Sequence, residues 1–199
     1  MKTSVAVVID MQNDFMPGGA LPVPRGREII PNILKELPKF DMVVFTQDCH
    51  PKGHISFASS YDDKKPFDTI RIGNKHYKLW PDHCIQGEPG SQIVSELQAF
   101  PGHFFYKGTA WHDAGYSDPD LASRIKRRIP LEFSGEPLDI VIMGVATEYC
   151  VMNTTLDFLR YKDFIHSLSV QLSCIAPVDE IHGETGLEIL KTCGVHLIP

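Results

Sequence analysis

Short, continuously apolar runs recur along the chain and constrain its fold more than any other feature of the sequence. They cover residues 4–9, 42–47, 103–107, 139–144 and 163–168, and a shorter run at 195–198 could add one more. The runs are rich in β-branched and aromatic residues, as β-strands are. Because they are apolar throughout rather than alternating, we expect strands buried on both faces of a sheet.

Segments with helical periodicity or helix-like polarity separate these runs. They lie at residues 26–38, 118–129, 150–161 and 179–193. Strands that alternate with helices are joined by right-handed crossovers and form a parallel sheet covered on both sides. We therefore predict an α/β fold, a three-layer α/β/α sandwich with a mostly parallel, Rossmann-like central sheet. At 199 residues, the chain is expected to form a single domain over 1–199.

Composition and charge exclude several classes of protein. Apolar residues make up 43% and charged residues 22%, which is typical of a globular protein rather than a disordered or membrane-spanning one. The N-terminal residues 2–10 resemble neither a signal peptide nor a membrane span, so we expect a cytoplasmic protein with no membrane partner. A net charge of −6 disfavours nucleic-acid binding, and the basic cluster at 124–128 fits a solvated helix face.

The cysteines argue for a reducing compartment. Five of them are scattered along the chain, and none is in a CxxC pair. Because five is an odd number, at least one could not take part in a disulfide within the chain. Neither a disulfide framework nor a thiolate zinc site is indicated.

Residues 49–102 interrupt the alternation of strands and helices. This region is rich in Pro, Gly, Asp and His, and we expect a long loop that binds metal and substrate. Loops of this length inside a compact domain are usually functional.

Chemically distinctive residues stand at the carboxyl ends of the predicted strands. Asp10 ends the first, Asp48 the second and Lys107 the third, and a short turn after the fourth leads to Cys150. In an open parallel sheet, these ends converge on the crevice where ligands bind. Taken singly, Asp10 could cap a turn, Lys107 could be an exposed charge and Cys150 a small buried residue. Their coincidence at matching strand ends favours one site.

The three side chains Asp10, Lys107 and Cys150 complement one another as a nucleophilic site. A helix N-terminus and a nearby cation lower the pKa of a thiol, so we expect Cys150 to form a thiolate readily. Asp10 can accept the thiol proton, while Lys107 holds that carboxylate and keeps the like charge of a thiolate from raising its pKa. Backbone N–H groups of Ala146 and Cys150, in the turn before the helix, are candidates for an oxyanion hole.

A second constellation of candidate residues begins at the end of the second predicted strand. Asp48 and His50 face the same side of an extended segment, and His83 is available from the long loop as a third ligand. One carboxylate and two imidazoles suit Zn²⁺, Mn²⁺ or Fe²⁺. His54 is left open as a ligand, and a role as turn-capping polar residues remains the alternative for the set. Cys49 and Cys84 are expected to pack away from it, since strand neighbours face opposite sides.

Five ordered motifs carry a resemblance to a known family. They are "VVIDMQNDF", "TQDCHPKGHISF", "LWPDHCIQG", "FYKGT" and "GVATEYCVMNT". Together they resemble the nicotinamidase branch of the isochorismatase-like cysteine hydrolases, over residues 5–160. The resemblance implies Asp10, Lys107 and Cys150 as the catalytic triad and Asp48, His50 and His83 as metal ligands.

The same resemblance implies a substrate and a cofactor. It implies hydrolysis of nicotinamide to nicotinate and ammonia through a cysteine thioester, with one divalent ion, zinc before manganese or iron. Phe15 and Trp80 match the aromatic residues that sandwich the pyridine ring, and the bond before Ala146 matches one that the family holds in the cis form. Tyr149 either lines the pocket or caps the helix. Trp111 and Tyr116 are candidates for a lid or an oligomer contact, and homo-oligomerisation is left open.

Two alternatives to this function remain. One is another isochorismatase-like amidase that acts on a different small amide, although the three metal ligands argue against the isochorismatase branch itself. The other is a non-catalytic ligand-binding module on the same fold, since fold alone does not imply function. No GxGxxG follows the first strand, which argues against a dinucleotide site. Residues 162–177 depart from the family pattern and are expected to affect the sheet rim or subunit packing more than the chemistry.

Overall fold

A six-stranded parallel sheet forms the centre of the computed structural model, which describes residues 2–112, 115–129 and 135–199. Its strands are β1 (Thr3–Ile9), β2 (Met42–Asp48), β5 (His103–Lys107), β6 (Leu138–Val145), β7 (Ile165–Ala176) and β8 (His196–Ile198). Their order is β5-β2-β1-β6-β7-β8, and every neighbouring pair is parallel. This is the doubly wound order of Rossmann-like sheets, in which the chain starts at the centre and builds outward in both directions.

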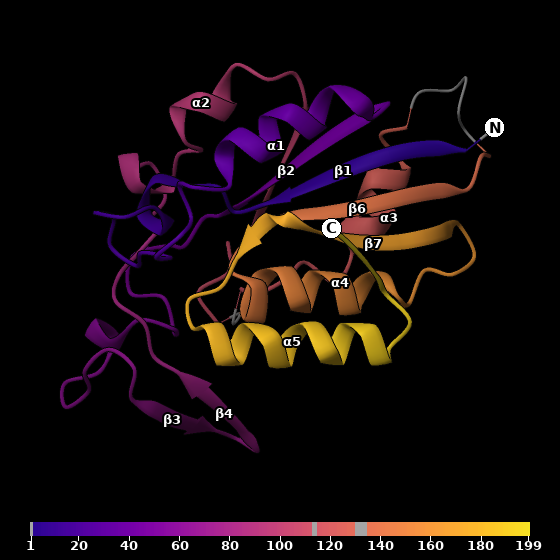
Figure 1. Ribbon diagram of the computed structural model, residues 1–199. Helices are drawn as coiled ribbons and strands as arrows, with labels where there is room; N and C mark the ends of the chain where they lie inside the picture. The colour runs from indigo at the N-terminus through magenta and orange to yellow at the C-terminus, as the bar shows by residue number, and fades with distance from the viewer. Residues whose placement is uncertain (1, 113–114, 130–134) are drawn as a thin grey trace.

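Helices cover both faces of the sheet (Figure 1). They are α1 (Ile30–Glu36), α2 (Ser95–Gln98), α3 (Leu121–Lys126), α4 (Met152–Phe158) and α5 (Glu180–Thr192). Helices α1 and α2 lie on one face, and α3, α4 and α5 lie on the other. The predicted three-layer α/β/α architecture is confirmed.

Strand β1 shows how one continuously apolar run serves two cores. Ala6 and Val8 pack with Ile33 of α1 in one core, whereas Val5 and Val7 pack with Ile125 of α3 in the other. Successive side chains of a strand point to opposite faces, so a strand buried on both sides must be apolar at every position.

No helix in the described ranges is both long enough and apolar enough to span a bilayer.

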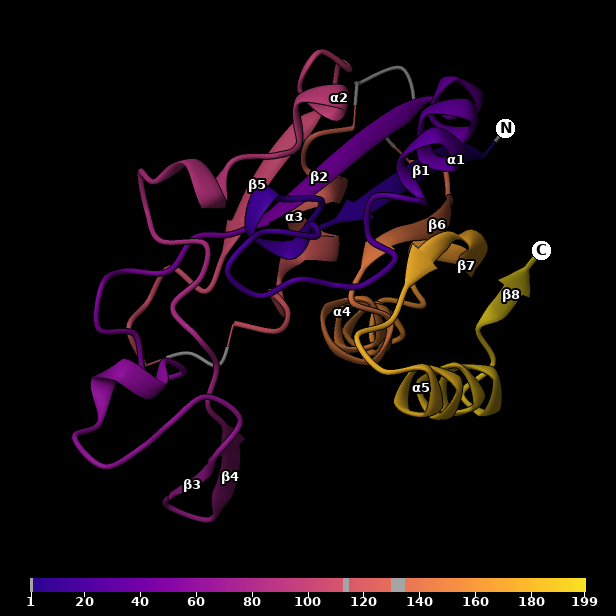
Figure 2. The same cartoon turned by 60° about the vertical axis from the view of Figure 1, so that its left-hand side comes forward.

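The expectation of one long loop over residues 49–102 is only partly right. The region contains an antiparallel hairpin, β3 (Thr69–Ile72) and β4 (Lys75–Lys78), which projects from the body of the molecule (Figure 2). Helix α2 also falls within it. The hairpin strands carry mostly exposed side chains and lack an apolar run, so no hydrophobic pattern marked them.

Two elements differ from their predicted bounds in ways that bear on the site. The predicted strand at 163–168 extends to Ala176 as β7, and it is not the rim of the sheet, because β8 pairs with its residues 169–171. The helix expected to begin at residue 150 is preceded by a π-helical turn, Thr147–Val151, so Cys150 lies inside that turn. Single π-helical turns occur frequently at functional sites.

Gly144 allows β6 to approach β1 closely just before this turn. It pairs with Ile9, and its φ of +109° lies in a region that side chains rarely adopt. A Cβ atom at this position would lie 2.1 Å from the Ile9 carbonyl oxygen. The contact places the residues that follow the two strands next to each other.

Candidate active site and metal centre

The topological switch point, on either side of which the chain adds strands in opposite directions, lies between β1 and β6. Asp10 and the turn after β6 flank it. Ligands of open α/β sheets bind at such switch points, beyond the carboxyl ends of the strands. Asp10 leaves β1 with a φ of +50°, in the left-handed region that Asp tolerates better than most residues, and its N–H donates to the Thr46 carbonyl oxygen at 3.3 Å. This turn directs the buried Asp10 carboxyl group toward β5.

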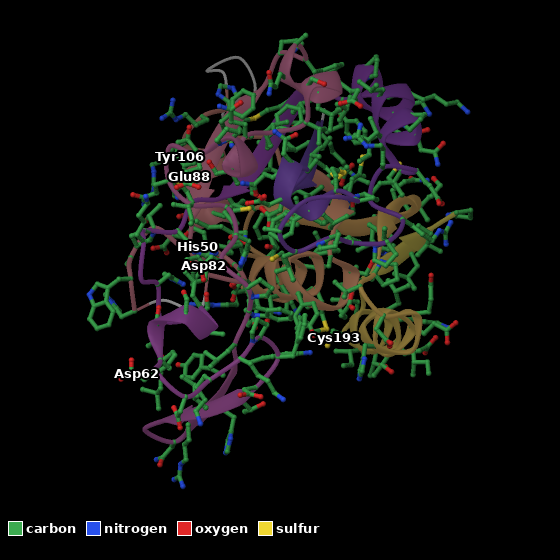
Figure 3. The ribbon with its side chains drawn as sticks, turned by 90° about the vertical axis from the view of Figure 1, so that its left-hand side faces the viewer. His50, Asp62, Asp82, Glu88, Tyr106 and Cys193 are labelled. Atoms are coloured by element: carbon green, nitrogen blue, oxygen red, sulfur yellow. The ribbon has the colours of Figure 1, made fainter. Side chains whose placement is uncertain are left out.

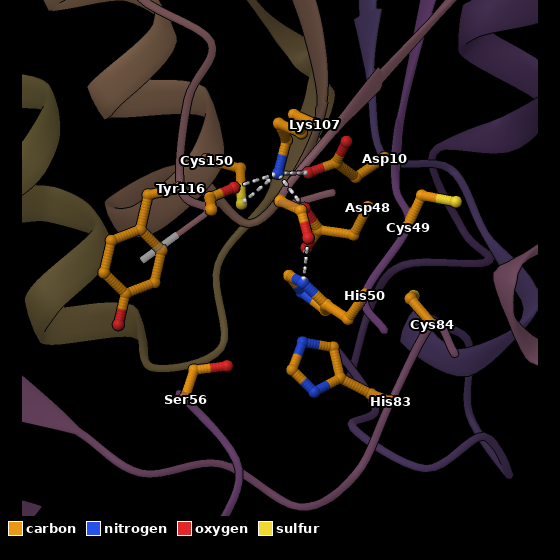
Figure 4. A network of polar contacts seen from close by, with 12 residues as sticks. Asp10, Asp48, Cys49, His50, Ser56, His83, Cys84, Lys107, Tyr116 and Cys150 are labelled. Atoms are coloured by element: carbon orange, nitrogen blue, oxygen red, sulfur yellow. Dashed lines mark hydrogen bonds and ion pairs between the residues drawn. The ribbon is translucent and has the colours of Figure 1, made fainter. Parts of the chain in front are cut away.

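The Lys107 ammonium group is the centre of the site (Figure 4). Its Nζ lies 2.8 Å from Asp10 Oδ2 and 3.3 Å from Cys150 Sγ, and it also contacts Asp48 Oδ1. A fourth bond runs to the Gly115 carbonyl oxygen at 2.8 Å. The structure therefore brings the predicted triad together, and it joins the triad to Asp48 through one buried cation.

Burial and pairing set the charges of this cluster. Burial alone would lower the pKa of Lys107, but the carboxylates of Asp10 and Asp48 outweigh it and raise that pKa well above its usual range. Burial would likewise raise the pKa of Asp48, yet Lys107 and His50 hold it below its ordinary value. Lys107 is thus a cation and Asp48 an anion.

The expectation of a lowered pKa for the Cys150 thiol is wrong. The pKa of Cys150 lies well above that of a free thiol, because full burial outweighs the attraction of the Lys107 charge and the nearby carboxylates add to it. Burial also raises the pKa of Asp10, although Lys107 opposes the rise. The helix N-terminus and cation do not produce a resting thiolate, so the sulfur keeps its proton until a base removes it.

The turn after β6 holds the nucleophile candidate and the predicted oxyanion residues. Ala146 and Cys150 both line the cavity, and the Ala146 carbonyl oxygen accepts bonds from the N–H groups of Tyr149 and Val151 at 3.0 and 3.2 Å. The peptide bond between Val145 and Ala146 is cis, as the family resemblance implies.

Asp48, His50 and His83 form a compact group that could hold a metal ion. One ligand atom from each lies within 4.8 Å of the others, and all three residues are buried. His50 Nδ1 is 3.0 Å from the Gly108 carbonyl oxygen, and His83 Nδ1 is 2.7 Å from that of Pro81. A carbonyl can only accept, so each Nδ1 carries a proton, and a neutral ring would then offer the lone pair of its Nε2 to an ion. The donor set and these tautomers fit a divalent ion such as Zn²⁺.

Two glycines form a tight cradle for the His50 ring. A Cβ on Gly108 would lie 2.4 Å from His50 Cε1, and one on Gly115 would lie 2.8 Å from the same atom. Both residues have positive φ angles, +62° and +78°. Only glycine satisfies both demands, so the "KGT" motif and Gly115 fix the orientation of this imidazole.

His54 lies beside the metal group but is not one of its three members. Its ring centroid is 4.2 Å from that of His50, and its Nδ1 lies 2.7 Å from Ser56 Oγ. Burial, and then the proximity of His50, lower the pKa of His54 to about 4. Burial lowers the pKa of His83 to about 4 as well. Both rings are neutral at neutral pH, as metal-binding imidazoles must be.

A cavity of about 40 Å³ joins the two groups of residues. His50 and Cys150 lie on its wall together with Phe15 and Trp80, the two residues expected to hold the ring, and with Tyr149. The structure therefore favours the pocket-lining alternative for Tyr149.

The two other aromatic candidates have different positions. Tyr116 lines the cavity, and its hydroxyl oxygen accepts a bond from Trp80 Nε1 at 2.9 Å. Trp111 is exposed on the surface. They belong to a polar and aromatic segment, of which residues 113–114 lie outside the described part of the chain.

Gln12 supports the metal group and was missed by the sequence analysis. Its side chain is fully buried and bonds twice to the backbone of Asp48, with Nε2 donating to the carbonyl oxygen and Oε1 accepting from the N–H group, both at 2.8 Å. One signal in the sequence could have indicated Gln12. It is an amide side chain that follows the candidate base Asp10 by two residues, just after an apolar strand.

The remaining cysteines are separate from this chemistry. Cys84 belongs to the hydrophobic core, as expected, and Cys49 is half-buried with its sulfur directed away from Lys107 (Figure 4). Cys193 is exposed at the carboxyl end of α5 (Figure 3).

Known proteins are similar to this chain in sequence. The isochorismatase domain model matches residues 4–165. A nicotinamidase of Acinetobacter baylyi is 37% identical over 162 residues, covering 76% of this chain and 72% of its own. A nicotinamidase of Saccharomyces cerevisiae is 35% identical, covering 81% of this chain and 84% of its own, and one of Escherichia coli is 32% identical, covering 92% and 89%.

Solved structures agree with the sequence comparison. A nicotinamidase and pyrazinamidase of Acinetobacter baumanii superimposes with a TM-score of 0.88 at 32% identity, over 100% of this chain and 96% of its own. A pyrazinamidase of Pyrococcus horikoshii in complex with zinc gives a TM-score of 0.76 at 33% identity, over 98% of each chain. With a family model matching most of its length and relatives above 30% identity, this chain belongs to the isochorismatase family.

Proposed function

We propose that this protein is a metal-dependent amidohydrolase that converts nicotinamide to nicotinate and ammonia. The observation that carries the proposal is the Lys107 ammonium group, which contacts Asp10, Asp48 and Cys150 at once beside an aromatic cavity. The names of the relatives support the substrate, since all three with the identities given above are nicotinamidases.

Residues of the cavity wall account for binding of an aromatic amide. Phe15 and Trp80 offer apolar ring faces, and the bond from Trp80 Nε1 to Tyr116 holds the indole in one orientation. The pyridine ring lies between Phe15 and Trp80, with its carboxamide toward Cys150. Binding in this manner supplies the orientation that a slow amide hydrolysis needs.

Asp48, His50 and His83 would hold the divalent ion, with zinc preferred because a related pyrazinamidase binds zinc. An ion held there would supply a Lewis acid at this end of the cavity, which would help to orient a ring that carries a basic nitrogen.

Asp10 and Cys150 carry out the chemistry in two stages. Asp10 takes the proton from the Cys150 thiol as Sγ attacks the amide carbon, and the N–H groups of Ala146 and Cys150 stabilise the oxyanion. Asp10 then returns the proton to the departing nitrogen, which leaves as ammonia, and a thioester remains. Water attacks the thioester with Asp10 again as base, giving nicotinate and the free thiol. Because burial raises the pKa of the Cys150 thiol, the attack needs a base such as Asp10 to take its proton.

Lys107 has a positioning and electrostatic part in this scheme. Its ammonium group holds Asp10 within reach of Cys150 and offsets the negative charge that develops on sulfur. It also holds Asp48 in the metal group, so one residue serves both halves of the site.

An ammonia assay tests this proposal. Purified protein is incubated with nicotinamide as isolated, after removal of metal by a chelator, and after zinc is restored. We expect ammonia release that chelation abolishes and zinc recovers, with slower release from benzamide, which lacks the ring nitrogen. Release from another small amide but not from nicotinamide would favour the alternative amidase, and no release from any amide would favour the non-catalytic module.

A further inference from the structure

Glu148 is a buried carboxylate in the turn that holds Cys150, and the proposed chemistry does not use it. Its side chain meets the backbone that follows β7, at the start of α5. Oε1 accepts bonds from the N–H groups of Val178 at 3.0 Å and of Asp179 at 2.9 Å, and Oε2 lies 3.2 Å from the Val178 nitrogen. One side chain thereby ties the nucleophile's turn to the connection between β7 and α5.

The residue held by this clamp is part of the cavity. Val178 lines it, as do Ala146, Tyr149 and Cys150 of the turn. Residues 162–177, which depart from the family pattern, end directly before Val178, so this segment adjoins a residue of the cavity wall.

Helix α5 packs directly on the turn at the same place. A Cβ on Gly186 would lie 3.4 Å from the Glu148 Cα atom, which leaves little space between helix and turn. Asp179 caps α5 separately, with its carboxylate accepting a bond from the His182 N–H at 2.9 Å. The helix cap and the Glu148 clamp are therefore distinct interactions at neighbouring residues.

We propose that Glu148 is a positioning residue that sets the width of the substrate cavity, by holding the Val178 wall at a fixed place relative to the turn that carries Cys150. The kinetic test of this proposal rests on the proposed amidase function, because it compares rates of amide hydrolysis. A carboxylate is suited to the task, because bonds from backbone N–H groups to a charged acceptor are stronger than neutral ones. Loss of the clamp would let Val178 move and weaken the discrimination between aromatic amides that differ by one methyl group.

Substrate discrimination provides the test, because a ratio of two activities does not depend on the fraction of enzyme that is folded. Several ring-methylated nicotinamides are first tested with the wild-type enzyme, and the poorest one that is still hydrolysed is chosen. The kcat/KM for nicotinamide is then divided by the kcat/KM for this methylated substrate. We expect Glu148→Ala to lower this ratio about tenfold, the scale on which an enzyme pocket distinguishes one methylene group. Its KM for nicotinamide should rise more than its kcat falls.

Two further variants distinguish positioning from a loss of stability. Glu148→Gln keeps an oxygen at the place of Oε1, which accepts the bonds from the Val178 and Asp179 N–H groups. The substrate ratio of this variant should therefore stay within about twofold of the wild-type ratio. Asp179→Ala removes the α5 cap and should destabilise the protein by weakening that helix, while leaving the ratio unchanged. An unchanged ratio in Glu148→Ala, or an equal change in Asp179→Ala, would overturn the proposal.

Hydrogen exchange tests the clamp without any substrate. In Glu148→Ala, amides in both the 144–152 and the 176–183 peptides should exchange faster, whereas Asp179→Ala should affect only the peptide that begins α5. If the protein released no ammonia from any amide, the proposed function would fail, and exchange alone would decide whether the clamp exists. Exchange unchanged at 176–183 in Glu148→Ala would contradict the clamp even in an active enzyme.

Discussion

The two ends of the central sheet carry similar charged groups in opposite surroundings. At the amino end, Lys2 Nζ lies 3.0 Å from His166 Nε2, and His166 Nδ1 lies 2.8 Å from Asp139 Oδ1. At the carboxyl end, Lys107 pairs with Asp10 and Asp48, and His50 Nε2 lies 3.6 Å from Asp48 Oδ2. The Lys2 and Asp139 side chains are 46% and 34% exposed, whereas those of Lys107 and Asp10 are 2% and 0% exposed.

The two networks contain similar residue types and differ mainly in burial: the network at the carboxyl end is buried, and the one at the amino end is exposed. At the amino end, water screens each charge, and such networks contribute little to stability or chemistry. At the carboxyl end, water is excluded, so each charge depends on its neighbours and pKa values move far from their ordinary range. Matched substitutions at the two ends should therefore have very different effects.

The largest contrast is expected between the two lysines. Lys107→Met leaves two buried carboxylates without their cation and should cost about 3 to 5 kcal/mol of unfolding free energy, and it should remove most of the amidase activity. Lys2→Met, at the exposed network, should change the unfolding free energy by less than about 1 kcal/mol. Urea denaturation of both variants measures the difference, and equal losses would show that burial is not the deciding factor.

A smaller contrast is expected between two glycines with similar backbone angles. Gly108 and Gly53 have φ values of +62° and +72°, but a Cβ would clash with His50 at Gly108 and would meet nothing within 4 Å at Gly53. Gly108→Ala should displace the His50 ring and weaken metal binding about 10-fold to 100-fold, as loss of support around a ligand does. Gly53→Ala should incur only the backbone strain.

Isothermal titration calorimetry with zinc measures the metal affinity of these two glycine variants. If Gly108→Ala bound zinc as tightly as Gly53→Ala, the glycine cradle would have no part in the metal site.

The smallest effect is expected at Asp139. Burial would raise its pKa, but bonds from Ser167 and His166 outweigh this and lower it. A lowered pKa adds stability that is present above the ordinary value and is lost as the pH falls through the folded-state value. Asp139→Asn should cost less than about 1 kcal/mol at neutral pH, and this deficit should shrink below pH of about 4. A deficit that grew in acid would contradict the sign of this effect.

The order of elements and the main site could be predicted because both follow from local patterns. Runs such as residues 4–9 must be apolar at every position to be buried on two faces, and parallel topology then places Asp10, Lys107 and Cys150 at one edge. The hairpin at 69–78 escaped prediction, because its exposed strands have no apolar pattern.

Other features depend on distances that no pattern contains. The contact between Lys107 and Asp48 follows from their pairing across β2 and β5, and the placement of Tyr116 follows from the path of its loop. The pKa of Cys150 could not be judged from its neighbours in sequence, because burial, a tertiary property, outweighs the nearby cation. Glu148 lies within a motif used to recognise the family, yet its partners are 30 and 31 residues away.

The most direct test of the account is ammonia release by Cys150→Ala, compared with wild type at equal zinc content. Removing the sulfur deletes the proposed nucleophile but leaves Lys107 paired with both carboxylates, so the variant should fold and bind zinc. We expect its rate of ammonia release from nicotinamide to fall by at least about 10⁴-fold, as for loss of a nucleophile in other hydrolases. A folded, zinc-loaded Cys150→Ala protein that still released ammonia at the wild-type rate would contradict the account.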